Sequence, residues 1–217
     1  MDGKVSPIID ADQVKEKYIE RMGKPLGELF HALWGDIALL HLEWQQYRQL
    51  YGTNPERIDI LNRIAPSCFY IIKETLWNNT LLHISRLTDK VQSCGKPNLC
   101  LRQLVQILPK GSLNQEVDKL IIIAEKRAEP IRELRNQFIA HYALNLIQEH
   151  NFKLLPKTSR KLVEDVLEAI RNTMNCVEER YCQATTEYKI VIGAFGDADD
   201  LLVALNAFLE TKQIEGK

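Results

Sequence analysis

Apolar residues recur along the chain at steps of three and four, which is the spacing that places them on one side of an α-helix. The longest run without a slip covers residues 26–51, and it is typical of a helix packed against nearly parallel or antiparallel neighbours. Its members are Leu26, Phe30, Leu33, Ile37, Leu40, Trp44, Tyr47 and Tyr51. We therefore predict a long helix here, preceded by a short helix over residues 11–22 that ends at Gly23.

A second long helix is predicted to follow a clear start signal. Asn54 is a good N-cap, and Pro55 suits the first helical position, where its missing N–H costs nothing. The apolar spacing then continues to about Asp89, so we expect one helix over residues 55–89. A loop and a short helix near residues 101–108 come next.

Two more long helices complete the pattern. The third begins near Ser112, and Pro130 inside its apolar pattern predicts a kink or a break near Ala128. The fourth begins within residues 158–161 and ends before Gly193.

No strand-like alternation of polar and apolar residues is found. The predicted fold class is therefore all-α, a four-long-helix up-and-down bundle with short accessory helices. We predict three parts: residues 1–24 as an N-terminal segment with a short helix, 25–190 as the bundle, and 191–217 as a linker and a short C-terminal helix. Asp197, with Asp200 three positions later, is expected to cap that last helix.

Composition narrows the class of protein. Hydrophobic residues make up 45% of the chain, charged residues 26%, and the net charge is -1, which excludes a generally basic coat protein for nucleic acid. The five cysteines include no C-x-x-C pair and predict buried free thiols in a reducing cytoplasm. No stretch reaches the ~18 apolar residues of a membrane span. The histidines show no ligand-like pairing, so we expect no metal, and no cofactor is indicated.

One short stretch, R-N-Q-F-I-A-H-Y at residues 135–142, interrupts an apolar helix face with chemistry-bearing side chains. An arginine followed by a histidine at this spacing is expected by chance roughly 0.8 times in a chain of this composition. On a regular α-helix, six positions leave Arg135 and His141 about 120° apart. The two side chains would converge only if the helix unwinds before His141, or if two copies pack around a two-fold axis.

The same stretch resembles the R-x(4–6)-H motif of HEPN domains, an all-α superfamily whose second motif residue is Asn, Asp or His. L-H-I-S-R-L-T-D-K at residues 82–90 and N-L-C-L-R-Q-L at residues 98–104 resemble the AbiU-type abortive-infection branch. The resemblance covers roughly residues 26–188. It implies a helical bundle, commonly a homodimer whose two motifs face one another across a two-fold axis. Many such domains are metal-independent endoribonucleases of phage-defence or toxin–antitoxin systems.

Carried over by position, the resemblance assigns Arg135 to the scissile phosphate of an RNA substrate and His141 to acid/base catalysis. A histidine exchanges protons near neutral pH, and an arginine fork binds phosphate oxygens in pairs. Asn136 occupies the variable polar position and is expected to orient a partner group. The 2′-hydroxyl of RNA would be the nucleophile, so the implied reaction needs no metal.

Two neighbouring residues complete the expected site. HEPN toxins that a nucleotidyltransferase partner silences usually carry a tyrosine two positions after the histidine, but here that position is Ala143. Tyr142 is adjacent to the histidine instead, which argues against regulation by nucleotide transfer but leaves Tyr142 as a lining residue and an antitoxin partner as an open option. Arg86 either pairs with Asp89, which i,i+3 spacing favours, or enters the cleft.

Two alternatives to an endoribonuclease stay open at this point. The chain could be a non-catalytic HEPN module that binds a nucleotide, RNA or a protein partner, or a helical scaffold whose motif is accidental. The basic residues within 126–135 alternate with Glu125, Glu129 and Glu133, which favours a solvated face over an RNA track.

Overall fold

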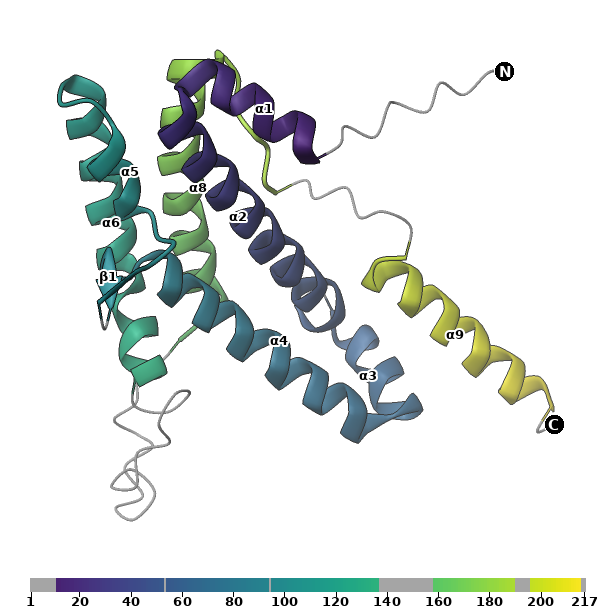
Figure 1. The fold of residues 1–217 in the computed structure, drawn as a ribbon. Coiled ribbons are helices and arrows are strands. Elements are labelled where there is room, and N and C mark those ends of the chain that lie inside the picture. The colour runs from purple at the N-terminus through teal and green to yellow at the C-terminus, as the bar shows by residue number, and fades with distance from the viewer. Residues whose placement is uncertain (1–10, 53, 94, 137–157, 190–195, 216–217) are drawn as a thin grey trace, which may run out of the picture. The chain divides into compact units, whose positions relative to one another are not determined.

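The computed structural model describes residues 11–52, 54–93, 95–136, 158–189 and 196–215, which form eight helices and one small hairpin (Figure 1). The four long helices of the predicted bundle are α2 (Lys24–Tyr51), α4 (Pro66–Leu87), α6 (Ser112–Leu134) and α8 (Arg160–Cys182). The others are α1 (Ala11–Met22), α3 (Pro55–Ile64), α5 (Arg102–Ile107) and α9 (Ala198–Glu215). The prediction of an all-α helical bundle is confirmed. The division at residues 24 and 190 stays a prediction, and most of the linker after residue 190 lies outside the described residues.

The chain separates into two compact units. The first unit contains residues up to 36 together with 86–127 and 164–186, and the second contains 37–85, 128–163 and 187–217. Each long helix contributes residues to both units, because the boundaries fall within α2, α4, α6 and α8.

The first unit is built on an apolar core that the helical spacing predicted. Phe30 of α2, Ile121 of α6 and Ile170 of α8 are all fully buried. The Phe30 ring meets the Tyr18 ring of α1 edge to face, with ring centroids 4.8 Å apart. The Tyr18 hydroxyl donates to Glu178 Oε1 at 2.7 Å, and burial, reinforced by this carboxylate, raises the pKa of Tyr18. The contact anchors α1 to α8.

A two-stranded hairpin in the first unit was not predicted. β1 (Gln92–Ser93) pairs antiparallel with β2 (Lys96–Pro97), with Gln92 opposite Pro97. Gly95, at φ +77°, supplies the left-handed backbone that the tight turn needs. Strands of two residues are too short to produce a period-two pattern, so the prediction of no strands is wrong at these positions.

In the second unit, the helix expected over residues 55–89 is divided in two. α3 ends at Ile64 and α4 begins at Pro66, with Ala65 between them at φ -158° and ψ 72°. A proline disfavours helical backbone in the residue before it, which explains why the break falls at Ala65. The start of α3 is as predicted, because the Asn54 side chain accepts a hydrogen bond from Arg57 N–H.

Pro130 does not break α6. The helix runs without interruption from Ser112 to Leu134, although an interior proline costs about 3 kcal/mol. Ala124, Ala128 and Ile131 are fully buried on both sides of it, so packing of this face offsets the missing backbone hydrogen bond. Of the kink or break predicted near Ala128, the break is therefore wrong, and the kink stays a prediction.

The C-terminal helix α9 is longer than the short helix predicted, but its cap is the predicted one. Asp197 Oδ1 accepts the N–H groups of Asp199, at 2.9 Å, and Asp200, at 3.3 Å. Asp200 in turn accepts the N–H of Gly196 at 3.1 Å. Reciprocal bonds of this kind satisfy the first orphan donors of a helix.

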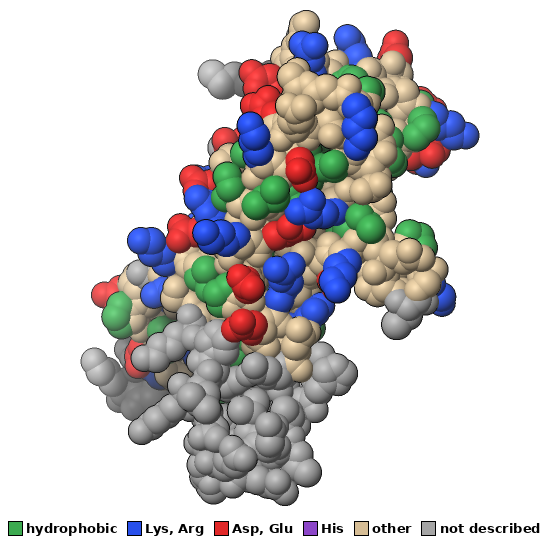
Figure 2. All heavy atoms as spheres, turned by 90° about the vertical axis from the view of Figure 1, so that its left-hand side faces the viewer, with side chains coloured by type: hydrophobic (Ala, Val, Ile, Leu, Met, Phe, Trp, Pro, Cys, Tyr) green, Lys and Arg blue, Asp and Glu red, His purple; other side chains and the backbone are tan. Residues whose placement is uncertain are grey.

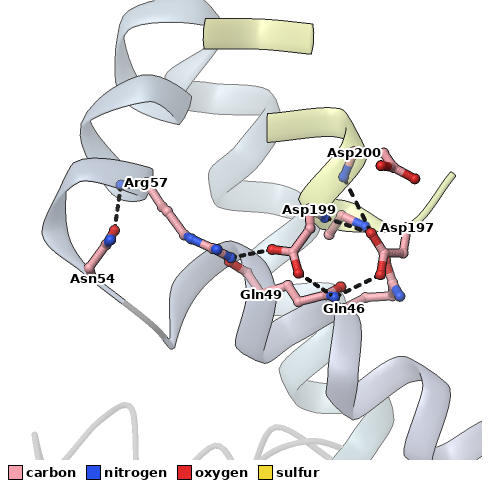
Figure 3. Close-up of polar contacts among 8 residues, drawn as sticks. Gln46, Gln49, Asn54, Arg57, Asp197, Asp199 and Asp200 are labelled. Carbon is pink, nitrogen blue, oxygen red and sulfur yellow. Dashed lines mark hydrogen bonds and ion pairs between the residues drawn. The ribbon is translucent and has the colours of Figure 1, made fainter. Parts of the chain in front are cut away.

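A polar clamp attaches the start of α9 to α2 and α3 (Figure 3). The Gln49 side-chain amide donates to both Asp197 and Asp199 at 2.8 Å, and Arg57 pairs with Asp199 at 2.5 Å. Gln46 accepts the backbone N–H of Ala198 at 2.8 Å. Beyond the clamp, Leu202 and Leu205 of α9 pack on an apolar cluster that includes Leu50, Leu61 and Phe69.

The clamp should weaken in acid. Hydrogen bonds from Gln49, then from the backbone of Asp200 and Asp199, hold the pKa of Asp197 below its ordinary value. A depressed folded-state pKa contributes stability above the unfolded value of about 3.9 and loses it as pH falls through the folded value. We expect amide-exchange protection of residues 198–210, relative to α8, to fall as pH drops below about 3.9. Asp197→Asn should remove this pH dependence, and an unchanged profile in that variant would contradict the assignment to Asp197.

Candidate functional site

The motif begins at the C-terminal end of α6, in the second unit. Arg135 is half-buried and Asn136 is exposed, and the Arg135 Nε donates to the Asn136 side-chain oxygen at 3.0 Å. The amide oxygen orients the guanidinium but carries no charge of its own, so this contact does not neutralise the arginine. The role of Asn136 in orienting a partner group stays a prediction.

The backbone changes at these same two residues. Leu134 is the last α-helical residue of α6, and Arg135 and Asn136 have π-helical backbone. Single π-helical turns are rare and frequently occur at functional sites. The 120° separation of the motif side chains assumes regular α-helix, whereas the first two motif residues have π-helical backbone. His141 and Tyr142, the other expected residues of the motif, lie outside the described residues.

Arg86 belongs to the first unit, whereas Arg135 and Asn136 belong to the second. Its guanidinium pairs with Asp36 of α2 at 2.6 Å, rather than with Asp89 on its own helix. The interpretation of an i,i+3 pair is therefore wrong. The Arg86 side chain remains 54% exposed, so an ion pair at this position contributes at most about 1 kcal/mol.

Within the first unit, the end of the first accompanying segment lies beside the second segment. Leu101 N–H donates to Leu87 O at 2.9 Å, and the Asn98 side chain donates to Lys90 O at 2.8 Å. Gln103 then reaches Val91 O at 2.9 Å. These bonds join residues 87–91 to residues 98–103, so the polar side chains of the second segment hold the hairpin in place rather than supply a reacting group.

Arg102, in the same segment, is fully engaged in the structure. It forms a bidentate pair with Glu125 of α6, with both N–O distances at 2.6 Å, and bonds Asp118 at 2.8 Å. Hydrogen bonding to Glu125 is the main cause of a raised pKa at Arg102. Two carboxylates surround this cation, so it joins α5 to α6 and is not a phosphate ligand in this arrangement.

A buried polar group in the second unit includes one residue that the sequence pattern did not single out. His83 of α4 is 5% exposed, and its Nδ1 lies 3.6 Å from Glu43 Oε2 of α2. Asn79, one turn before His83, donates to the other oxygen of Glu43 at 2.7 Å. Its burial makes His83 a core histidine. Glu43 could have been found only by its place on the α2 face turned toward α4, which the sequence does not give.

The basic residues of α6 are interspersed with acidic ones on the surface. Figure 2 views the side on which α6 is labelled in Figure 1, and Lys and Arg side chains lie among Asp and Glu side chains there. Arg127 donates to Asp165 O at 2.8 Å and lies 3.3 Å from Glu168. Lys126 and Glu129 are exposed. This supports the predicted solvated face over an RNA track along this part of α6.

The cysteines only partly match the expected burial. Cys100 is buried and Cys176 and Cys182 are half-buried, but Cys68 is exposed, so the prediction of buried thiols is wrong for Cys68. All four are free thiols. In the ranges that the structure describes, His, Cys, Asp and Glu side chains do not gather into a group able to hold a metal ion. No helix in those ranges combines the length and apolar character needed to span a membrane.

The chain is similar in sequence to one known protein family. A helical fold with an R-N-x(4)-H motif is typical of HEPN domains, and the family model HEPN_AbiU2, described as AbiU2, matches residues 23–199. The match includes the motif and both accompanying segments. The chain therefore belongs to the AbiU2 family, an abortive-infection branch of the HEPN superfamily. No curated protein and no solved structure matches the chain.

Proposed function

We propose that this abortive-infection HEPN protein is a metal-independent endoribonuclease acting in phage defence or in a toxin–antitoxin system. The observation that carries the proposal is the family match, which spans residues 23–199 and contains the whole of R-N-Q-F-I-A-H-Y. The π-helical backbone and the Arg135–Asn136 contact add support, because both set the arginine apart from the regular helix before it.

In the proposed reaction, the 2′-oxygen of one nucleotide attacks the adjacent phosphorus and the bond to the 5′-oxygen breaks. His141 exchanges the protons, accepting one from the 2′-hydroxyl or delivering one to the departing 5′-oxygen. Arg135 binds the non-bridging phosphate oxygens, where negative charge grows in the transition state. The products are a 2′,3′-cyclic phosphate and a 5′-hydroxyl. A homodimer in which two motifs face one another would supply two histidines, one for each proton.

The test is cleavage of end-labelled single-stranded RNA by the purified protein in excess EDTA. We expect cleavage to continue at an undiminished rate and to leave 2′,3′-cyclic phosphate ends, because the 2′-hydroxyl is the nucleophile and no metal takes part. The matched control is the same strand with a 2′-O-methyl group at each cleavage position, which should resist. Cleavage of that strand, loss of cleavage in EDTA, or no cleavage of any RNA would contradict the proposal.

A further inference from the structure

The second unit also contains an aromatic pocket. The pocket has a volume of about 380 Å³, which falls within the range of small-molecule sites. Helices α2, α3 and α4 and the first residue of α8 line it. The lining residues on which the argument depends are Tyr47, Tyr51, Phe69, Tyr70, Lys73 and Arg160.

The floor of this pocket is made of rings that are fixed in place. Tyr47 is 7% exposed and stacks on Trp44, with ring centroids 5.2 Å apart and planes 9° from parallel. The Tyr51 hydroxyl donates to Phe69 O at 2.8 Å, which ties α2 to α4. Burial raises the pKa of Tyr51 to about 12, so its hydroxyl stays protonated and keeps donating across the neutral range. A rigid apolar floor of this kind binds a flat ligand at low entropic cost.

Tyr70, at the edge of the pocket, differs from the floor residues in its exposure to solvent. It is 63% exposed, and the structure gives it neither a ring partner nor a hydrogen bond within the described residues. Its neighbour Lys73 lies one turn further along α4, on the same side of the helix. An exposed ring one turn from a cation offers a stacking surface next to a phosphate ligand.

The pocket also contains two cations, Lys73 and Arg160. Among described residues, neither Lys73 nor Arg160 pairs with a carboxylate, and the pocket lining includes no Asp or Glu. Arg160 donates from Nη1 to Gly52 O at 2.7 Å, which holds it at the C-terminal end of α2. Another cavity, between α3 and α9, is different, because Glu56, Asp199 and Glu210 line it beside Arg57.

The Arg160 guanidinium is close enough to the floor to affect it. The pKa of Tyr47 is raised, mainly by burial; the charge of Arg160 acts in the opposite direction, and that of Glu74 adds to the rise. Arg160 is also the first residue of α8, so the positive end of that helix adds to the local potential. Two cations and no carboxylate in the pocket lining favour an anionic ligand beside the rings.

We propose that this pocket binds one nucleotide unit, with the base stacked on Tyr70 above the tyrosine floor and the phosphate held by Lys73 and Arg160. Flat rings alone would suit many apolar ligands, and two cations alone would suit many anions. A nucleotide has a base that can stack on the rings and a phosphate that can bind the cations. Tyr70 and Lys73 are one helical turn apart on α4, so one nucleotide can reach both. The unit is either a free mononucleotide or one nucleotide of a single RNA strand. Neither source requires the motif at residues 135–142 to be catalytic.

The experiment measures binding to the full-length chain by calorimetry, at low and at physiological salt. The probes are uridine and adenosine monophosphate, inorganic phosphate, and a 2′-O-methyl oligonucleotide that the proposed nuclease activity cannot cut. We expect a nucleotide-bearing probe to bind and inorganic phosphate to bind far more weakly. Tyr70→Ala should weaken nucleotide binding roughly five- to a hundredfold, as expected for the loss of one base–aromatic stack. Lys73→Gln should weaken it about tenfold and reduce its salt dependence.

Matched variants separate the site from general charge and folding effects. Tyr70→Phe keeps the ring and should retain affinity. Lys119→Gln removes an exposed lysine of the first unit and should change nothing. Binding of monophosphates supports a free nucleotide, and binding of the oligonucleotide alone supports an RNA strand. Equal binding of inorganic phosphate, equal loss in Lys119→Gln, or no binding of any probe would overturn the proposal, whatever the result of the cleavage assay.

Discussion

His141→Ala should lower the rate of RNA cleavage by about 10²–10⁴-fold, which is the usual contribution of a positioned acid or base. Arg135→Ala should lower it by about 10²–10³-fold, because one strong ligand of the developing phosphate charge is lost. Arg135→Lys should restore little, since an ammonium cannot form the paired bonds of a guanidinium. Single-turnover cleavage of a labelled RNA measures all three rates, and urea unfolding of each variant checks that the fold is intact.

The matched control for this loss is His31→Ala, which removes a half-buried histidine of α2 in the first unit that stacks on Trp34. The cleavage rate of His31→Ala should equal that of the parent chain.

A mixed dimer tests how the motif is assembled. If each site takes Arg135 from one chain and His141 from the other, mixing the two inactive variants should restore activity, because one of the two sites then has both residues. Cleavage at the parent rate in His141→Ala would contradict the role assigned to that histidine.

Phe30→Ala should lower the free energy of unfolding by about 3–5 kcal/mol. This is the largest loss of stability that we predict for a single substitution. Phe30 is fully buried, and its ring meets Tyr18 edge to face at 4.8 Å. Truncation leaves a cavity and also removes the ring pair, which contributes about 0.5–1.5 kcal/mol. A domain of ordinary stability, about 5–15 kcal/mol, would lose a large part of its margin. The measurement is urea unfolding: the midpoint should fall, and the slope of the unfolding free energy against urea concentration should stay unchanged.

The same substitution at Phe208 provides the control. Phe208 lies on α9, is 51% exposed and has Lys212 Nζ 5.5 Å from its ring centroid. Phe208→Ala should shift the midpoint by no more than about 0.5 kcal/mol, as for most exposed positions. Equal losses at Phe30 and Phe208 would mean that burial does not govern the stability of α2.

Much of the fold could be predicted from the sequence, because helix formation depends on the spacing of apolar residues close together in the chain. The spacing from Leu26 to Tyr47 follows the helical period, and the structure buries that face. The errors fall where the outcome depends on other elements. Pro130 stays inside α6 because packing at Ala128 and Ile131 supports it, whereas Pro66 ends a helix because nothing offsets the extended residue before it.

The candidate site could be predicted only in part for a similar reason. The motif letters are in the sequence, but the π-helical backbone at Arg135 is not, because no residue pattern marks it. Arg86 illustrates the second difficulty. A helix partner three residues away was the natural expectation, yet Asp36, fifty positions earlier, takes the guanidinium. The aromatic pocket was hidden in the same way, since Tyr47, Tyr70 and Arg160 come from three separate helices.

The family match and the clamp on α9 end at almost the same place, and this bears on how the chain can be shortened. A chain ended at residue 199, the last residue matched, would keep the polar contacts of Asp197 and Asp199. It would lose Leu202 and Leu205, so the apolar cluster that contains Leu61 would be open to water. Such a fragment should be prone to self-association, because large exposed apolar patches drive aggregation. The boundary that sequence similarity draws is therefore not the boundary at which this chain can be cut.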